Sequence, residues 1–346
     1  MTAAGDDGPP LVDEAAARWA AAFVAPSHRA DPAAVAVLRA DVAADLPAID
    51  AAARAWTQIG VDLPPTTARV VGRGGFVAAN LAGMRGAFEP LRARLERRRR
   101  LASRVLGTQI GALLGLLSSK VLGQFVLPLG GLGGGQLLVV GPNVMALADE
   151  HGDLAADIRR TVVLHEVTHR LQFDGTPWLG DHLRGLMDRY LAGARVDSAA
   201  LLDVAPRLPA ALRAVRESGD LSPLLQTVLT EEQVAVVDEA QGLMSLLEGH
   251  GNASMYDAAT DDLIADPSGV REALASRRND MTSKVLTAVG GLEMKRRQYR
   301  EGEAFVRGVV DLAGIDGLNR AFVAPDHLPR GDEVSDPAGW LARVGD

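Results

Sequence analysis

Residues 164–173 read LHEVTHRLQF, and two histidines, His165 and His169, stand four positions apart within this stretch. On an α-helix such a pair projects from one face, about 6 Å apart along the axis. Both imidazoles can therefore bind one metal ion, with Glu166 beside them. Two histidines and one further ligand leave zinc an open position for water, which catalytic zinc sites have and structural sites lack. The stretch predicts a helix that carries a catalytic zinc site.

This spacing also gives Glu166 a role. Bound zinc polarises a carbonyl group and lowers the pKa of bound water to roughly 7. Glu166 is the expected general base, which takes the proton and later delivers it to the leaving group of an amide or ester. Zinc is preferred over iron or manganese because nitrogen and carboxylate ligands without a redox partner suit it. The alternative is a helix whose histidines face the core, or pair with Glu166, without a metal.

A third ligand is expected in MSLLEGHGN, residues 244–252. Glu248 is the favoured candidate, on a predicted helix. His250 is the rival, two positions further on and facing another direction if the helix continues. Asp257 and Glu239 are weaker options.

If Glu248 is the ligand, His250 is a candidate catalytic residue that donates a hydrogen bond to the oxyanion formed during water attack. Tyr256 and Tyr299 are open to the same role. Asn252, one turn beyond Glu248, is a candidate partner for a ligand histidine. The structural alternatives are a surface histidine beside a helix-ending glycine and an asparagine that caps the helix.

The composition predicts a mainly α protein of the α+β class. Hydrophobic residues make up 47% of the 346 residues, aromatic residues only 4%, and Ala, Leu, Val and Arg dominate, which favours an aliphatic, helical core. Cysteine is absent, so any metal must be bound by His, Asp or Glu. The net charge of −8 argues against general binding to nucleic acid. Residues 1–10 lack the features of a secretory signal, so a cytoplasmic location is expected.

The apolar run 105–119 contains Gly107, Gly111 and Gly115, a spacing that permits close contact between helices. The run is shorter than the roughly 20 residues that a bilayer core requires. We therefore expect a buried helix and no stable membrane insertion. A membrane-anchored protease is the alternative.

Apolar periodicity and turn residues predict the other elements. Trp19, Ala22 and Phe23 have helical spacing, and Asp31-Pro32 is a helix start. A strand is expected over 136–140, after a flexible glycine-rich connection at 130–135 and just ahead of the metal motif. Helices are expected within 11–58 and over 76–91, 105–119, 153–173 (capped by Asp153), 179–193, 198–216, 222–249, 268–286 and 288–313.

Three regions follow from these elements. Residues 1–100 form an N-terminal helical region, 101–330 a zinc-binding domain, and 331–346 a C-terminal tail, with loop-like chain from Pro325. Phe173, Trp178 and Leu179 line the mouth of the cleft or belong to the ordinary core. The strand 136–140 either offers a free edge to an extended peptide or lies inside a small sheet.

The sequence around the motif resembles an actinobacterial zincin-like metallopeptidase family. The resemblance is carried by residues 164–173, 177–179, 107–124, 139–143, 245–250, 298–299 and 302–303. It implies a largely helical zincin-like fold with a small β element near the active-site helix, and zinc-dependent hydrolysis. One branch of that family is associated with organisms that make a deazaflavin cofactor. In the family an acidic residue usually follows the methionine after Glu-Gly-His, whereas here Tyr256 intervenes, which weakens a ligand role for Asp257.

Two functions from different classes are compatible with these features. The leading hypothesis is a zinc metallopeptidase or amidohydrolase that acts on a peptide or a small amide, with His165, His169 and Glu248 as ligands. The alternative is a non-catalytic binding protein that retains the zincin scaffold, in which the metal only stabilises the fold.

Overall fold

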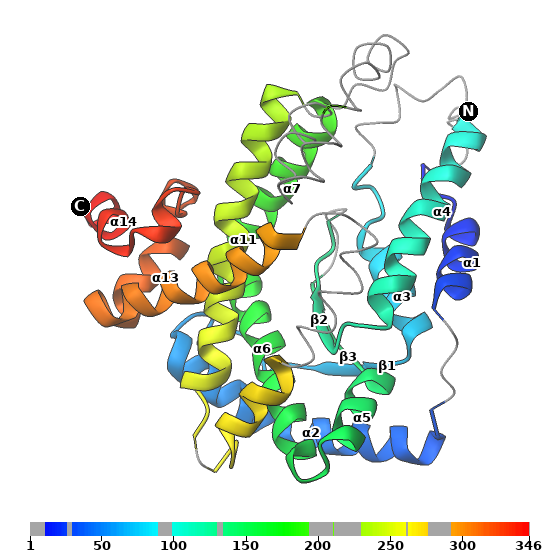
Figure 1. The fold of residues 1–346 in the computed structure, drawn as a ribbon, viewed down its shortest axis with the longest axis horizontal. Helices are drawn as coiled ribbons and strands as arrows, with labels where there is room; N and C mark the ends of the chain where they lie inside the picture. Colours follow the sequence, from blue (N-terminus) through cyan, green and yellow to red (C-terminus); the bar gives the residue numbers. More distant parts are fainter. Residues whose placement is uncertain are drawn as a thin grey trace, which may run out of the picture.

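A three-stranded sheet with the order β1-β3-β2 stands between helices (Figure 1). The structure, a computed structural model, describes residues 11–25, 30–88, 99–129, 134–193, 210, 230–260, 262–275 and 292–345, with backbone only for 99–102 and 292–300. The central strand, β3 (Gln136–Val140), pairs in parallel with β1 (Ala68–Val71) and antiparallel with β2 (Gly123–Val126). The predicted strand 136–140 is thus internal and has no free edge for a peptide.

Helices cover both faces of the sheet, which explains why residues 137–140 of β3 form a continuous apolar run. Leu137 and Val139 pack with α2 (Pro32–Thr57), α5 (Gly141–Glu150) and α6 (Ala155–Gly175). Val140 packs with α1 (Glu14–Val24), α3 (Arg73–Gly83) and α4 (Arg99–Ser118). In a strand that is buried on both faces, apolar residues do not alternate with polar ones. The predicted mainly α class with a small β element is confirmed.

The glycine spacing in 105–119 serves helix packing. A Cβ atom on Gly107, Gly111 or Gly115 of α4 would overlap backbone atoms of Asp13, Ala17 or Ala21. The two helices therefore approach closely through their backbones. Among the described residues, none of the helices combines the length and the apolar character that crossing a bilayer requires.

A second hydrophobic core lies between α7 (Pro177–Gly193), α11 (Glu231–Asp257), α13 (Leu292–Asn319) and α14 (Pro337–Val344). α11 starts at a capping box, in which Thr230 and Gln233 bond each other's backbone N–H groups. It runs eight residues beyond the predicted end at 249, so the segment EGHGN is helical.

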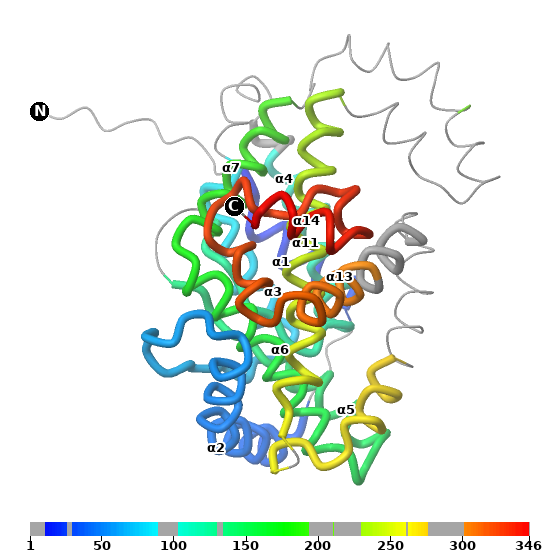
Figure 2. The backbone as a smooth tube through the Cα atoms, turned by 90° about the vertical axis from the view of Figure 1, so that its left-hand side faces the viewer, coloured from blue at the N-terminus to red at the C-terminus, as the bar shows by residue number. Residues whose placement is uncertain are grey.

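Figure 2 shows α2 and α5 at one end of the molecule and α7 toward the other.

Several elements differ from the prediction. Asp153 lies in the 3-10 turn η3 (Gly152–Leu154) and does not cap α6. The N-cap position of α6 is occupied by Leu154, which makes no side-chain hydrogen bond to the helix. No helix was predicted over residues 141–150, where α5 directly follows β3 with proline in its first turn. The tail is not all loop, because Asp336 caps α14 through Gly339 N–H and Trp340 is completely buried.

Some predictions fall outside the described residues, among them the helix 198–216 apart from residue 210, and most of the glycine-rich connection 130–135. The division at residues 100 and 330 stays a prediction. Described contacts cross both boundaries: β1 pairs with β3, and Trp340 Nε1 donates a hydrogen bond to His327 O over 2.9 Å.

Candidate metal centre

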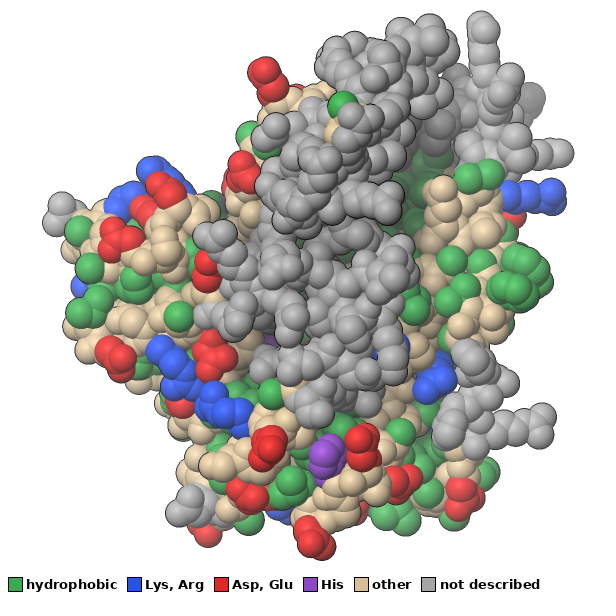
Figure 3. All heavy atoms as spheres, viewed as in Figure 1, with side chains coloured by type: hydrophobic (Ala, Val, Ile, Leu, Met, Phe, Trp, Pro, Cys, Tyr) green, Lys and Arg blue, Asp and Glu red, His purple; other side chains and the backbone are tan. Residues whose placement is uncertain are grey.

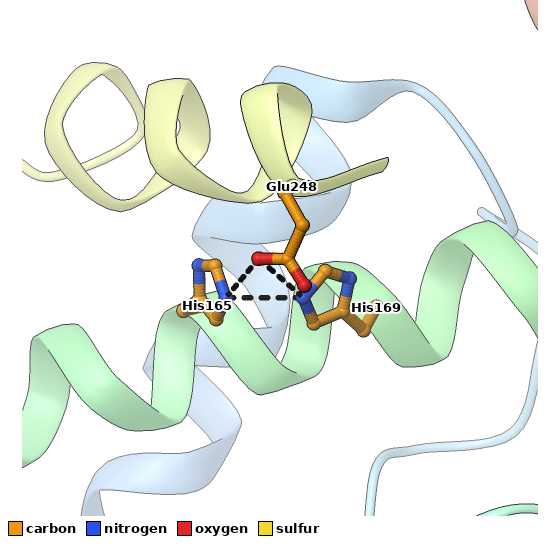
Figure 4. Close-up of side chains that lie close together, drawn as sticks. All are labelled: His165, His169 and Glu248. Carbon is orange, nitrogen blue, oxygen red and sulfur yellow. Dashed lines mark hydrogen bonds and ion pairs between the residues drawn. The ribbon is translucent and has the colours of Figure 1, made fainter. Parts of the chain in front are cut away.

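His165, His169 and Glu248 meet between α6 and α11 (Figure 4). The two Nε2 atoms are 3.0 Å apart, and Glu248 Oε2 lies 3.6 Å from His165 Nε2 and 3.9 Å from His169 Nε2. All three side chains keep partial exposure, between 13% and 22%. The structure therefore brings the two predicted histidines and the favoured third residue to one point.

The donor set fits a zinc ion. Zinc–nitrogen bonds of about 2.0–2.1 Å in a tetrahedral site place two nitrogens about 3.3 Å apart, close to the 3.0 Å between the imidazoles. Two imidazoles and one carboxylate match the set that leaves an open position on catalytic zinc. These three residues could hold the metal with a small outward adjustment.

The glycines of Glu248-Gly249-His250-Gly251 explain how α11 reaches the site. A Cβ atom on Gly249 would overlap backbone atoms of Gly302, so α11 and α13 cross closely at this point. A Cβ atom on Gly251 would lie 2.8 Å from Cε1 and 2.9 Å from Nδ1 of His165. The imidazole therefore rests directly on the backbone of α11, where only glycine leaves it room.

Glu166 lies on α6 beside the cluster and is only 6% exposed. Its carboxylate accepts a hydrogen bond from the backbone N–H of Phe125 in β2, and a Cβ atom on Gly123 would come within 2.6 Å of Glu166 Cγ. Burial raises the pKa of this carboxyl from 4.5 to about 7, against the lowering effect of His169 and with a further rise from Glu248. Glu166 can thus gain and lose a proton near neutral pH.

His250 has a different place from Glu248. Its side chain is completely buried, between Trp56 and Phe322, with ring centroids 5.2 Å and 5.4 Å away. Its Nδ1 lies 3.0 Å from Gln172 Nε2. Burial lowers the pKa of this imidazole to about 3, so the ring is neutral at neutral pH. A histidine so enclosed is poorly placed to touch a substrate directly.

The other predicted candidates lie outside the cluster. Asp257 pairs with Arg307, and Glu239 pairs with Arg189. Tyr256 has the Arg271 guanidinium 3.8 Å from its ring centroid.

Asn252 is buried inside α11 instead of capping its end. The side chain of Tyr299 falls outside the described residues. Beyond the motif, Leu179 is completely buried, Trp178 donates to Phe322 O over 3.1 Å, and Phe173 stacks on Phe125 with ring centroids 6.3 Å apart. Leu179 therefore belongs to the second hydrophobic core, and Phe173 and Trp178 are partly buried side chains that pack against it.

Gln172 is a site residue that the sequence reasoning missed. Its Oε1 lies 2.8 Å from His169 Nδ1, and its Nε2 donates to Leu247 O over 3.0 Å. The only sequence signal was its position one turn after His169, which places it beside that ring. A second buried contact joins the same helices through Thr168 Oγ1 and Ser254 Oγ, 2.6 Å apart.

A solved structure and a protein family both resemble the chain over nearly its full length. A search of curated proteins found no match to the sequence. A crystal structure from Chloroflexus aurantiacus, described as a candidate hydrolase with a novel fold, is 28% identical, with a TM-score of 0.70 over 96% of this chain and 99% of the other. Residues 12–341 match the family of zincin-like metallopeptidases. This match covers both helices of the metal centre, and the chain belongs to the zincin-like metallopeptidase family.

Proposed function

We propose that the protein is a zinc-dependent hydrolase that cleaves an amide bond in a peptide or a small amide. The observation that supports this most directly is the convergence of His165, His169 and Glu248 from two helices, with their donor atoms within 4.8 Å of one another. Family membership supports the same class of reaction. Zinc, when bound there, would supply a Lewis acid and lower the pKa of water to about 7.

Glu166 is the proposed general base. Its pKa near 7 suits a group that accepts a proton from water and later donates it to the leaving amine. The Phe125 N–H holds the carboxylate, and the bare backbone of Gly123 lies against its stem. Both contacts come from β2, so this strand positions the base.

His250 is proposed to act through neighbouring residues rather than on the substrate. Its complete burial between Trp56 and Phe322 favours this role over donation to an oxyanion.

Metal analysis tests the ligand set. Protein purified without chelators or added zinc should contain close to one zinc per chain, and His165→Ala and Glu248→Ala should each lose it. His182→Ala is the matched control, because His182 lies on α7 and pairs with Glu239 instead. Absence of zinc in the wild type even after reconstitution would refute the site, and loss of zinc only in His250→Ala would refute Glu248 as ligand.

Glu166→Gln tests the chemistry. The variant should keep its zinc but lose hydrolysis by a factor of about 10²–10⁴, the usual contribution of a general base. The measurement is turnover of a mixed set of internally quenched peptides and N-acyl amino acid amides. Glu239→Gln is the control and should match the wild type. Undiminished turnover by Glu166→Gln would contradict the assignment of Glu166 as general base, whereas no turnover by the zinc-loaded wild type would favour the non-catalytic binding protein.

A further inference from the structure

We propose that Gln172 is a positioning residue of the metal centre: its side-chain amide holds His169 in the tautomer that can bind a metal and couples that ring to α11 and His250. The inference rests on the proposed zinc site but concerns residues that bind no metal themselves. It starts from the contacts of one amide, which reaches three groups on two helices.

The orientation of this amide follows from its surroundings. Leu247 O can only accept, so the group 3.0 Å away must be the NH2 of Gln172. The carbonyl oxygen of the amide then points to His169, with 2.8 Å between Oε1 and Nδ1. Since a carbonyl oxygen can only accept, the proton of His169 must be on Nδ1.

This proton position is the one that metal binding needs. With the proton on Nδ1, the lone pair of His169 is on Nε2, which faces His165 and Glu248. Ligand histidines in proteins are commonly oriented by such a hydrogen bond on the other nitrogen. An amide oxygen does here what a carboxylate or backbone carbonyl does elsewhere.

The other end of the amide ties His169 to the third ligand. Leu247, which accepts from Gln172, immediately precedes Glu248 on α11. The same NH2 group donates to Nδ1 of His250, whose ring is wedged between aromatic side chains. His250 thus limits the movement of Gln172, and Gln172 limits the movement of His169. This sequence of contacts explains a histidine buried next to the site yet enclosed by the core.

Two substitutions at position 172 separate positioning from packing. Gln172→Met keeps an unbranched side chain of similar length but cannot bond His169. Its zinc dissociation constant, measured by competition with a chromophoric chelator, should rise by about 10–100-fold. Gln172→Glu keeps an acceptor for Nδ1 but cannot donate to Leu247 O. It should recover zinc affinity to within a few fold of wild type although its melting temperature is lower.

Ser254→Ala is the matched control, because it removes another buried hydrogen bond between α6 and α11 that does not touch a ligand. It should lower the melting temperature of the metal-free protein and leave the zinc dissociation constant unchanged. If Ser254→Ala weakens zinc binding as much as Gln172→Met, the effect is general helix packing and the proposal is wrong.

A readout without metal keeps this inference separate from the proposed function. Long-range ¹H–¹⁵N NMR of the metal-free wild type should show His169 protonated at Nδ1, and Gln172→Met should show a mixture of both tautomers. His250→Phe should raise the zinc dissociation constant a few fold in the wild-type background and add nothing to Gln172→Met, since His250 acts through Gln172. An unchanged His169 tautomer in Gln172→Met, or fully additive losses in the double variant, would overturn the proposal.

Discussion

Glu166 and His250 are ionisable side chains in the same buried region, and burial favours the neutral form of each. For the carboxyl this raises the pKa to about 7, and for the imidazole it lowers the pKa to about 3. The Glu166 carboxyl lies beside the partly exposed side chains of the candidate metal ligands. The His250 imidazole is enclosed between Trp56 and Phe322. Burial thus leaves one group able to exchange a proton near neutral pH and makes the other a fixed neutral acceptor.

The raised pKa of Glu166 predicts a pH-dependent stability in the metal-free protein. The folded state holds the proton up to about pH 7, whereas the unfolded chain releases it near pH 4.5. The free energy of unfolding should therefore fall as pH rises through this window, by at most about 3 kcal/mol. Urea unfolding at a series of pH values should show that Glu166→Gln removes this decrease.

The exposed carboxyl of Glu272 provides the control. Glu272→Gln should keep the wild-type decrease, and the same decrease in Glu166→Gln would show that another group causes it.

Glycines decide how closely the helices approach, both at the metal centre and away from it. Gly251 lets the imidazole of His165 lie on α11, and the three glycines of α4 let α1 lie on its backbone.

The buried face of α1 is its alanine face. Trp19 and Phe23, whose spacing predicted the helix, stack on each other outside the core and are 66% and 79% exposed. Hydrophobic side chains gather at the right-hand edge of Figure 3, over the region of α1.

Gly251→Ala should weaken zinc binding. The added methyl group would lie 2.8 Å from Cε1 of His165 and must push the ring away from its partners. We expect the zinc dissociation constant to rise at least about tenfold, as for other disturbances of ligand orientation. Gly185→Ala on α7 is the control, because no atom lies within 4 Å of its new Cβ. It should leave zinc binding unchanged and stabilise the fold by up to about 1 kcal/mol. Equal zinc affinity in both variants would contradict this account of Gly251.

At the scale of the whole molecule, the metal centre lies between two hydrophobic cores. α6 belongs to the core around the sheet, and much of α11 belongs to the core shared with α13 and α14. The two histidines thus come from one core and Glu248 from a helix of the other. The C-terminal helix supports the second core through Trp340, which packs edge-on against Phe305 with ring centroids 5.3 Å apart.

Trp340→Ala should therefore destabilise the whole second core. A completely buried tryptophan replaced by alanine typically costs about 3–5 kcal/mol. Urea unfolding should show a single transition at lower urea concentration, whereas Leu312→Ala, at a 62% exposed position of α13, should change stability by less than about 0.5 kcal/mol. An early separate transition with an unchanged main one would instead indicate that residues 331–346 are an independent tail.

Local sequence patterns were sufficient to predict the elements that neighbouring residues determine by themselves. The spacing of His165 and His169 implies one helix face, the Asp31-Pro32 pair starts α2, and the apolar run 136–140 is β3. The strands β1 and β2 were missed, because four-residue segments carry too little periodicity to stand out. The extension of α11 past its glycines was also missed, since contacts with α6 and α13 stabilise helical glycines that local propensity disfavours.

The sequence alone led to His165, His169 and Glu166, because a helix repeat determines which side chains share a face. It left the choice between Glu248 and His250 as the third ligand open. The two side chains point in different directions from the same helix, and the sequence does not show which direction faces the helix that carries the histidines. The packing of α11 on α6 and α13 turns Glu248 toward the histidines and His250 toward Gln172, Trp56 and Phe322. Burial, and with it the pKa of Glu166, likewise arises only when β2 covers the helix.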